Sequence, residues 1–171
     1  MRFCLTFAVY CFEIEAIVIF FQNTESLNPN MILVSACLIG VNCRFDGQSR
    51  TNEALMSSLK GACYIPVCPE QLGGLPTPRS RAWITAGDGD DVLAGRASVV
   101  NEAGGDVTAQ FIRGALETEK LAALFNVKKA YLKGKSPSCG AGKIYHGKDL
   151  VSGNGVCAAL LLRKNIELVS V

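Results

Sequence analysis

From residue 31 onward, short apolar runs alternate with longer segments that repeat apolar residues every three or four positions. The short runs have the length of strands and end near Gly, Pro or Cys, while the longer segments have the period of helices. This alternation is typical of βα units, in which a crossover helix joins parallel strands of one sheet. The pattern therefore predicts an α/β fold: a single Rossmann-like domain with a mainly parallel sheet and helices packed on it.

Four strands and three helices are expected from this alternation. The strands are predicted over residues 31–35, 63–67, 129–133 and 166–169, and the helices over 52–60, 106–126 and 156–164. The Gly/Asp-rich segment 82–100 favours a polar hairpin or flap. Asp106 is the expected N-cap of the longest helix. Its buried face is predicted to carry Val107, Phe111, Ala115, Leu121, Leu124 and Phe125.

The length of 171 residues suits one domain and is too short for two. We assign residues 31–171 to this domain and residues 1–30 to an N-terminal extension. Residues 1–22 are apolar, but Glu13 and Glu15 interrupt them, so we expect no membrane role and a cytoplasmic protein. The net charge is only +2 and no Lys/Arg block stands out, which disfavours duplex nucleic acid. A small-molecule ligand and a monomer or small homo-oligomer are expected.

Three of the eight cysteines follow predicted strands. Cys37 comes just after the first strand, Cys68 closes the second, and Cys139 lies in the loop after the third. Ligands of an open parallel sheet bind outside the carboxyl ends of its strands, so these loops should converge on one crevice. The domain is large enough to need no disulfide framework. The sequence therefore predicts that the three thiols form one metal site.

Thiolate ligands favour either zinc or an iron–sulfur cluster, and the single histidine, His146, adds little to a zinc site. We prefer the cluster and leave zinc open. Three cysteines on a four-iron cluster would leave one iron as a Lewis acid. Cys43 is an alternative ligand or a bystander thiol. The remaining cysteines are expected to be structural, as free thiols are often buried: Cys4, Cys11, Cys63 and Cys157.

Two residues beside these cysteines are candidates for catalysis. Glu70 lies two residues after Cys68, and could act as general acid or base if burial raises its pKa; otherwise it is a surface carboxylate. Ser136 and, less so, Ser138 could hydrogen-bond a cluster sulfur or a substrate, although serine is also a common turn residue. Three charged residues of these loops could orient a polar ligand, with solvated charges favoured for the first two: Arg44, Asp46 and Arg79.

Several motifs resemble, in order, those of a small bacterial domain family that includes 2-thiouracil desulfidases: VSACLIG, IPVCPEQLGGLPTPR, GGDVTAQFIRGA, LKGKSPSCG and GNGVCAALL. The resemblance extends from residue 31 to 171. It implies a 4Fe-4S cluster held by Cys37, Cys68 and Cys139, and a free iron that binds the sulfur of a thiocarbonyl. It also implies Glu70 as the acid/base, assisted by Ser136.

Two functions are compatible with these observations. The first is an iron–sulfur-dependent, non-redox desulfidase that converts the thiocarbonyl of a thiolated nucleobase or similar small molecule into a carbonyl and hydrogen sulfide. The alternative is a non-catalytic module that binds a metal or cluster, with Glu70 as an ordinary loop residue. The resemblance favours the enzyme and does not fix its natural substrate.

Overall fold

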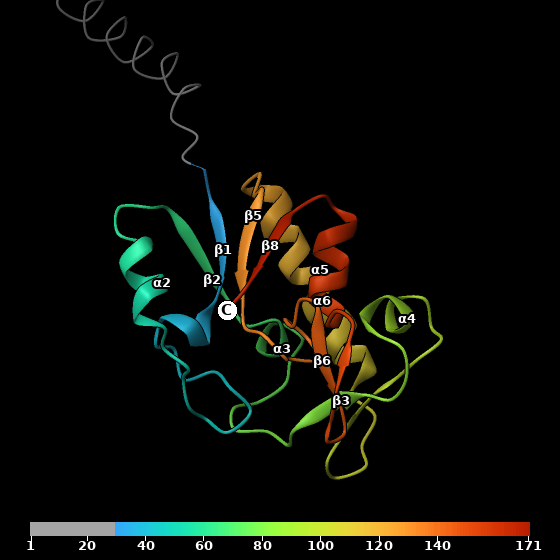
Figure 1. Ribbon diagram of the computed structural model, residues 1–171. Coiled ribbons are helices and arrows are strands. Elements are labelled where there is room, and N and C mark those ends of the chain that lie inside the picture. Colours follow the sequence, from blue (N-terminus) through green and yellow to red (C-terminus); the bar gives the residue numbers. More distant parts are fainter. Residues whose placement is uncertain (1–29) are drawn as a thin grey trace, which may run out of the picture.

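A four-stranded parallel sheet forms the centre of the protein (Figure 1). The computed structural model describes residues 30–171. The strand order is β2-β1-β5-β8, and all three neighbouring pairs are parallel. The bounds are β1 Ile32–Ser35, β2 Tyr64–Val67, β5 Lys129–Leu132 and β8 Glu167–Ser170. Each strand lies within one or two residues of its predicted position, which confirms the predicted fold class.

Helices and two hairpins connect the strands. The helices are η2 Ala36–Ile39, α2 Glu53–Ser58, α3 Pro69–Leu72, α4 Gly89–Leu93, α5 Thr108–Leu124 and α6 Val156–Arg163. The expected hairpin consists of β3 Ala82–Ile84 and β4 Val99–Asn101, with α4 between its strands. A second hairpin, β6 Lys143–His146 with β7 Asp149–Ser152, was not predicted. It lies in a segment rich in Gly, Lys and Asp, where the alternation of apolar and polar residues is weak.

The sheet is covered on both faces because β1 alternates its side chains between two apolar clusters. Leu33 packs into the larger cluster, which holds residues of α5 and α6. Val34 faces the opposite side and packs with Leu55 and Leu59 from the region of α2. The outcome is a three-layer arrangement with α2 on one face and α5 and α6 on the other (Figure 1).

The strand order creates a topological switch point at β1. The chain leaves β1 toward β2 on one side, and the later crossover returns it to β5 on the other side. Crossovers that depart in opposite directions open a crevice at the carboxyl ends of the strands. At this end the hydroxyl of Ser35 accepts a hydrogen bond from the backbone N–H of Lys133, with the two atoms 3.0 Å apart. This bond joins the ends of β1 and β5 beside the crevice.

Helix α5 begins and ends two residues inside its predicted range. The predicted N-cap, Asp106, is wrong, because Val107 occupies that position. Asp106 lies one residue before the N-cap, and its carboxylate accepts from the N–H of Thr108, the first residue of the helix, at 2.8 Å. The predicted burial of Leu124 and Phe125 is wrong, since these side chains are 75% and 41% exposed. The buried stripe instead continues to Ala122, and a residue two positions later lies on the other side of a helix.

The predicted domain, 31–171, nearly coincides with the described residues. The proposed extension, residues 1–30, and Cys4 and Cys11 within it lie outside them apart from Asn30, so the boundary stays a prediction. Within the described part of the chain, no helix is long and apolar enough to cross a membrane.

Helix α3 approaches α5 through glycine. A methyl group on Gly114 of α5 would overlap the carbonyl oxygen of Pro69, and one on Gly73 would overlap the carbonyl of Gln110. Backbones can come this close only where no Cβ intervenes. Because α3 begins directly after Cys68, this contact determines where the carboxyl end of β2 delivers its thiol.

We expect Gly114→Ala to lower the free energy of unfolding by about 2 kcal/mol, because the added methyl forces α3 away from α5. Urea denaturation measures the loss. Leu124→Ala, on the same helix but three-quarters exposed, serves as the control and should change it by less than about 0.5 kcal/mol. Equal effects of the two substitutions would contradict the close packing described for Gly114.

Candidate functional site

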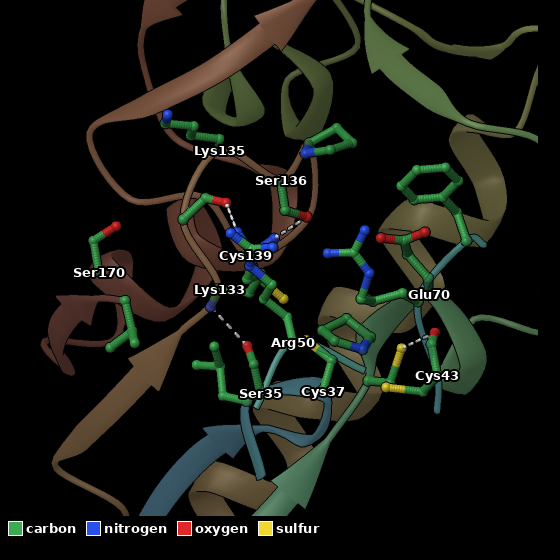
Figure 2. A pocket seen from close by; sticks show the side chains of 18 of the residues that line it. Ser35, Cys37, Cys43, Arg50, Glu70, Lys133, Lys135, Ser136, Cys139 and Ser170 are labelled. Carbon is green, nitrogen blue, oxygen red and sulfur yellow. Dashed lines mark hydrogen bonds between the residues drawn. The ribbon is translucent and has the colours of Figure 1, made fainter. Parts of the chain in front are cut away.

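A cavity of about 1310 Å³ opens at the carboxyl end of the parallel sheet (Figure 2). We call it the central cavity. The loops that follow β1, β2 and β5 line it, together with residues of β3, β6 and β8. All five residues predicted for the site line this cavity: Cys37, Cys68, Glu70, Ser136 and Cys139. The structure therefore brings together residues that are spread over about a hundred positions of the sequence.

The three predicted ligands reach the cavity from three different strand ends. Cys37 lies in η2, Cys68 is the N-cap of α3, and Cys139 lies in the loop after β5. Within residues 30–171, no three His, Cys, Asp or Glu side chains are arranged to hold one metal ion. The cysteines of a cubane cluster bind separate irons and so surround a volume rather than meet at a point. The donor set, three thiols around a cavity, fits such a cluster.

The loop that carries Cys139 is shaped by Ser136 and by the start of α6. The hydroxyl oxygen of Ser136 accepts hydrogen bonds from the N–H groups of Ser138 and Cys139, each at 3.1 Å. The first N–H groups of α6 donate to the carbonyls of Pro137 and Ser138. A methyl group on Gly155, the N-cap of α6, would overlap the Ser138 carbonyl, so the loop and the helix interlock.

Burial and hydrogen bonding favour the neutral form of the Cys68 and Cys139 thiols. Burial raises the pKa of the Cys139 thiol. The hydrogen bond with the Cys43 thiol, followed by burial, raises the pKa of Cys68. A metal binds the thiolate, so loading this site with a metal would release protons, and the metal would offset the cost of burying the negative charge.

Glu70 is held by an ion pair with Arg79. Arg79 Nε donates to Glu70 Oε2 at 2.7 Å, and the arginine side chain is only 5% exposed. The same guanidinium donates to the carbonyl oxygens of Cys43 and Pro76, both at 3.1 Å. Arg79 therefore connects α3 to the loops on either side of it. The sequence placed Arg79 only among charges that could orient a ligand. Its anchoring role was missed because Glu70 and the Cys43 carbonyl are remote from it in the sequence.

Cys43 is more central than the sequence indicated. It is buried, lines the central cavity, and belongs to the same cluster as Cys37, against which Cys68 also packs. Its carbonyl oxygen also accepts from the Cys68 thiol, at 3.5 Å. The hydrogen bond with Cys37, together with burial, raises the pKa of Cys43 to about 11 against the lowering effect of the bond with Cys68. The only signal in the sequence was its spacing of six residues from Cys37.

The central cavity is strongly positive. Seven basic residues line it, against Glu70 as the one acidic residue among its lining side chains: Arg44, Arg50, Arg79, Arg81, Lys133, Lys135 and Lys143. The Arg81 guanidinium lies over the ring of Tyr145, 5.0 Å from its centre. Burial lowers the pKa of Lys133, whose ammonium donates to the Gly134 carbonyl. Clustered charge of one sign attracts anions. The sequence did not indicate this positive cavity, because the net charge of the whole chain is only +2.

The remaining predicted residues divide in three ways. Ser138 is buried but does not line the cavity, and its hydroxyl has no hydrogen-bond partner among the described residues. Arg44 and Asp46 pair with each other at 2.7 Å at the cavity edge. Cys157 is fully buried in α6, as predicted, whereas Cys63 is exposed, which corrects that prediction. Cys63 precedes β2, the edge strand of the sheet, where no neighbouring strand covers it.

A family model described as 2-thiouracil desulfurase matches residues 32–171. The chain belongs to the 2-thiouracil desulfurase family. This result confirms the resemblance seen in the motifs. The chain is 41% identical over 143 residues to the uncharacterized protein YbbK of Bacillus subtilis (strain 168), covering 82% of this chain and 95% of that protein.

A solved structure supports the same family and fold. The 4Fe-4S-dependent thiouracil desulfidase TudS (DUF523Vcz) is 40% identical, with a TM-score of 0.69, over 82% of this chain and 90% of that chain. The two proteins therefore share one fold.

Arg79→Met should lower the free energy of unfolding by roughly 2 kcal/mol, because it leaves Glu70 without its counter-charge and removes the charged donor to the Cys43 carbonyl. Thermal or urea unfolding measures this loss.

Arg44→Met is the matched control, since it removes a second Arg–carboxylate pair of the same 2.7 Å length. Both partners of that pair are more open to water, so the loss of stability should be much smaller. A larger loss for Arg44→Met than for Arg79→Met would contradict the anchoring role of Arg79.

Proposed function

We propose that this chain is a 4Fe-4S-dependent, non-redox desulfidase. Its substrate is the thiocarbonyl of a thiolated nucleobase such as thiouracil or a similar small molecule, and its products are the carbonyl compound and hydrogen sulfide. The observation that carries the proposal is the meeting of three thiols, Glu70 and Ser136 in one cavity of a protein from this family. TudS, named as a 4Fe-4S-dependent thiouracil desulfidase, supports both the cofactor and the substrate class.

We assign the cluster to Cys37, Cys68 and Cys139. These residues follow three neighbouring strands, and they line a cavity of about 1310 Å³, which leaves room for a substrate beside the cofactor. With three cysteine ligands, a bound 4Fe-4S cluster supplies one iron with an open position, which is a Lewis acid suited to sulfur.

Glu70 is the proposed acid/base. The overall reaction adds water to C=S and yields C=O and H₂S, so no electrons are exchanged and only protons must be moved. Its Oε2 is bound to Arg79, which leaves Oε1 to take a proton from the attacking water. The same carboxyl group then returns that proton to the departing sulfur or to a ring nitrogen. Arg79 keeps the carboxylate oriented toward the cavity throughout.

Ser136 and the basic residues of the cavity assist these proton transfers. The Ser136 oxygen already accepts two N–H bonds, so its own hydroxyl proton remains available to donate to the substrate. The seven basic residues that line the cavity favour hydrosulfide, the anion that leaves the thiocarbonyl carbon. Lys133 lies three residues before Ser136 and is half-buried, so its charge is little screened by solvent.

We place the enzyme in the cytoplasm, because the cysteines of the described residues are all free thiols, which persist in reducing compartments. A small thiolated molecule is its partner, rather than duplex nucleic acid or a membrane, and it acts as a monomer or a small homo-oligomer.

Cys37→Ala, Cys68→Ala and Cys139→Ala should each abolish cluster binding. Iron and acid-labile sulfide, measured after anaerobic reconstitution, should fall from about four irons per wild-type chain to background. Cys63→Ala and Cys157→Ala are controls that should keep the cluster, and only Cys157→Ala should lose stability because its thiol is fully buried. Equal iron loss in both groups would overturn the ligand assignment.

Glu70→Gln should keep the cluster and lose turnover. The amide preserves the shape of the side chain but cannot exchange the proton, so sulfide release from 2-thiouracil should fall on the order of a hundredfold or more. Iron content and the visible absorption of the cluster must stay near wild type for the comparison to hold. A variant with nearly wild-type turnover would exclude Glu70 as the acid/base.

A further inference from the structure

We propose that Cys43 is a redox partner of the cluster ligands. In cluster-free protein, its thiol forms a reversible disulfide with Cys37 or Cys68, the two thiols that it contacts. The disulfide keeps a ligand in a form that thiols can reduce, and its reduction frees the ligand for cluster assembly. The chemistry depends only on the positions of the thiols, whereas its consequence for the cluster rests on the proposed function.

The contacts of Cys43 select it for this role. Cys43 and Cys37 belong to the same buried cluster, Cys68 packs against that cluster, and all three residues line the central cavity. The Cys68 thiol also donates to the Cys43 carbonyl at 3.5 Å. Cys139 belongs to the other buried cluster, on the side of α5 and α6, so it is left out of the exchange. A disulfide needs sulfur atoms about 2 Å apart, which side-chain rotation can achieve between neighbouring thiols of one cluster.

The backbone holds Cys43 in this place whether or not a cluster is present. Its carbonyl accepts from Arg79 at 3.1 Å, and its N–H donates to the carbonyl of Val41 at 2.9 Å. The N–H of Arg79 in turn donates to the Phe45 carbonyl at 2.8 Å, two residues beyond Cys43. These bonds involve no cluster ligand side chain. Loss of the cluster therefore leaves Cys43 beside the same two thiols.

The oxidation is a balanced two-electron step with hydrogen peroxide as the oxidant. One thiol reacts with peroxide to give a sulfenic acid and water, and the neighbouring thiol displaces a second water to form the S–S bond. Two thiols are thus oxidised and one peroxide is reduced to two waters. Attack by an external thiolate reverses the step. Without Cys43, the oxidised Cys37 or Cys68 has no such partner and proceeds to sulfinic acid, which thiols do not reduce. Cys139 is buried and therefore reacts slowly with peroxide.

The test uses the full-length protein, stripped of its cluster by an anaerobic chelator and then treated with a small excess of hydrogen peroxide. Peptide mass mapping of wild-type protein should find one disulfide that contains Cys43, with Cys37 or Cys68 as its partner. Cys43→Ser should show no such disulfide and more sulfinic acid at Cys37 and Cys68. The control Cys63→Ser, which removes an exposed thiol, should behave as wild type.

A second readout follows recovery. After thiol reduction and cluster reconstitution, wild-type protein should regain its iron, whereas oxidised Cys43→Ser should regain roughly half or less of that amount because sulfinic acids persist. Cys43→Ser that has not been oxidised should load iron as wild type does.

Three outcomes would overturn the proposal: no disulfide in wild type, a disulfide that lacks Cys43, or loss of the cluster from unoxidised Cys43→Ser, which would make Cys43 a ligand. Failure of the proposed function is seen separately, as wild-type protein that binds no cluster or releases no sulfide. The disulfide map comes from metal-free protein and is independent of both.

Discussion

The parallel pairing of β1 with β2 on one side and β5 on the other is the constraint on which the site depends. It places the carboxyl ends of the three strands at the same end of the sheet. It also makes β1 the switch point from which the crossovers run in opposite directions. Cys37, Cys68 and Cys139 follow these three ends directly or by a short loop. If one of these strands ran antiparallel, the thiol that follows it would lie at the opposite end of the sheet, about one strand length away.

Beyond the sheet, close backbone contacts refine the position of each thiol. Gly114 lets α3 approach α5, which fixes the residues after Cys68, and Gly155 lets α6 cap the loop that carries Cys139. Arg79 fixes the position of the polar residues, since its guanidinium donates hydrogen bonds to both the Glu70 carboxylate and the Cys43 carbonyl. The candidate catalytic carboxylate and the redox thiol therefore share an anchor, so disturbance of one is transmitted to the other.

The parts of the site that follow strand ends could be predicted from the sequence, and the parts that depend on tertiary contact could not. Apolar periodicity located β1, β2 and β5, and the cysteines after them were therefore expected to meet. The positive cavity escaped notice because its basic residues come from several loops and are balanced by acids elsewhere in the chain. Cys63 and Leu124 are exposed because no other element packs against them, the first beside an edge strand and the second at the end of a helix. The apolar residues around them in the sequence do not indicate this.

The proposed reaction removes sulfur without exchanging electrons. The most direct test is a count of the uracil and sulfide that anaerobically reconstituted wild-type protein releases from 2-thiouracil, with no electron donor or acceptor present. Many turnovers, with one sulfide for each uracil, are predicted, because water supplies the oxygen and Glu70 moves the proton. A requirement for a reductant, release of at most one sulfide per chain, or the same turnover by protein without its cluster would contradict the account.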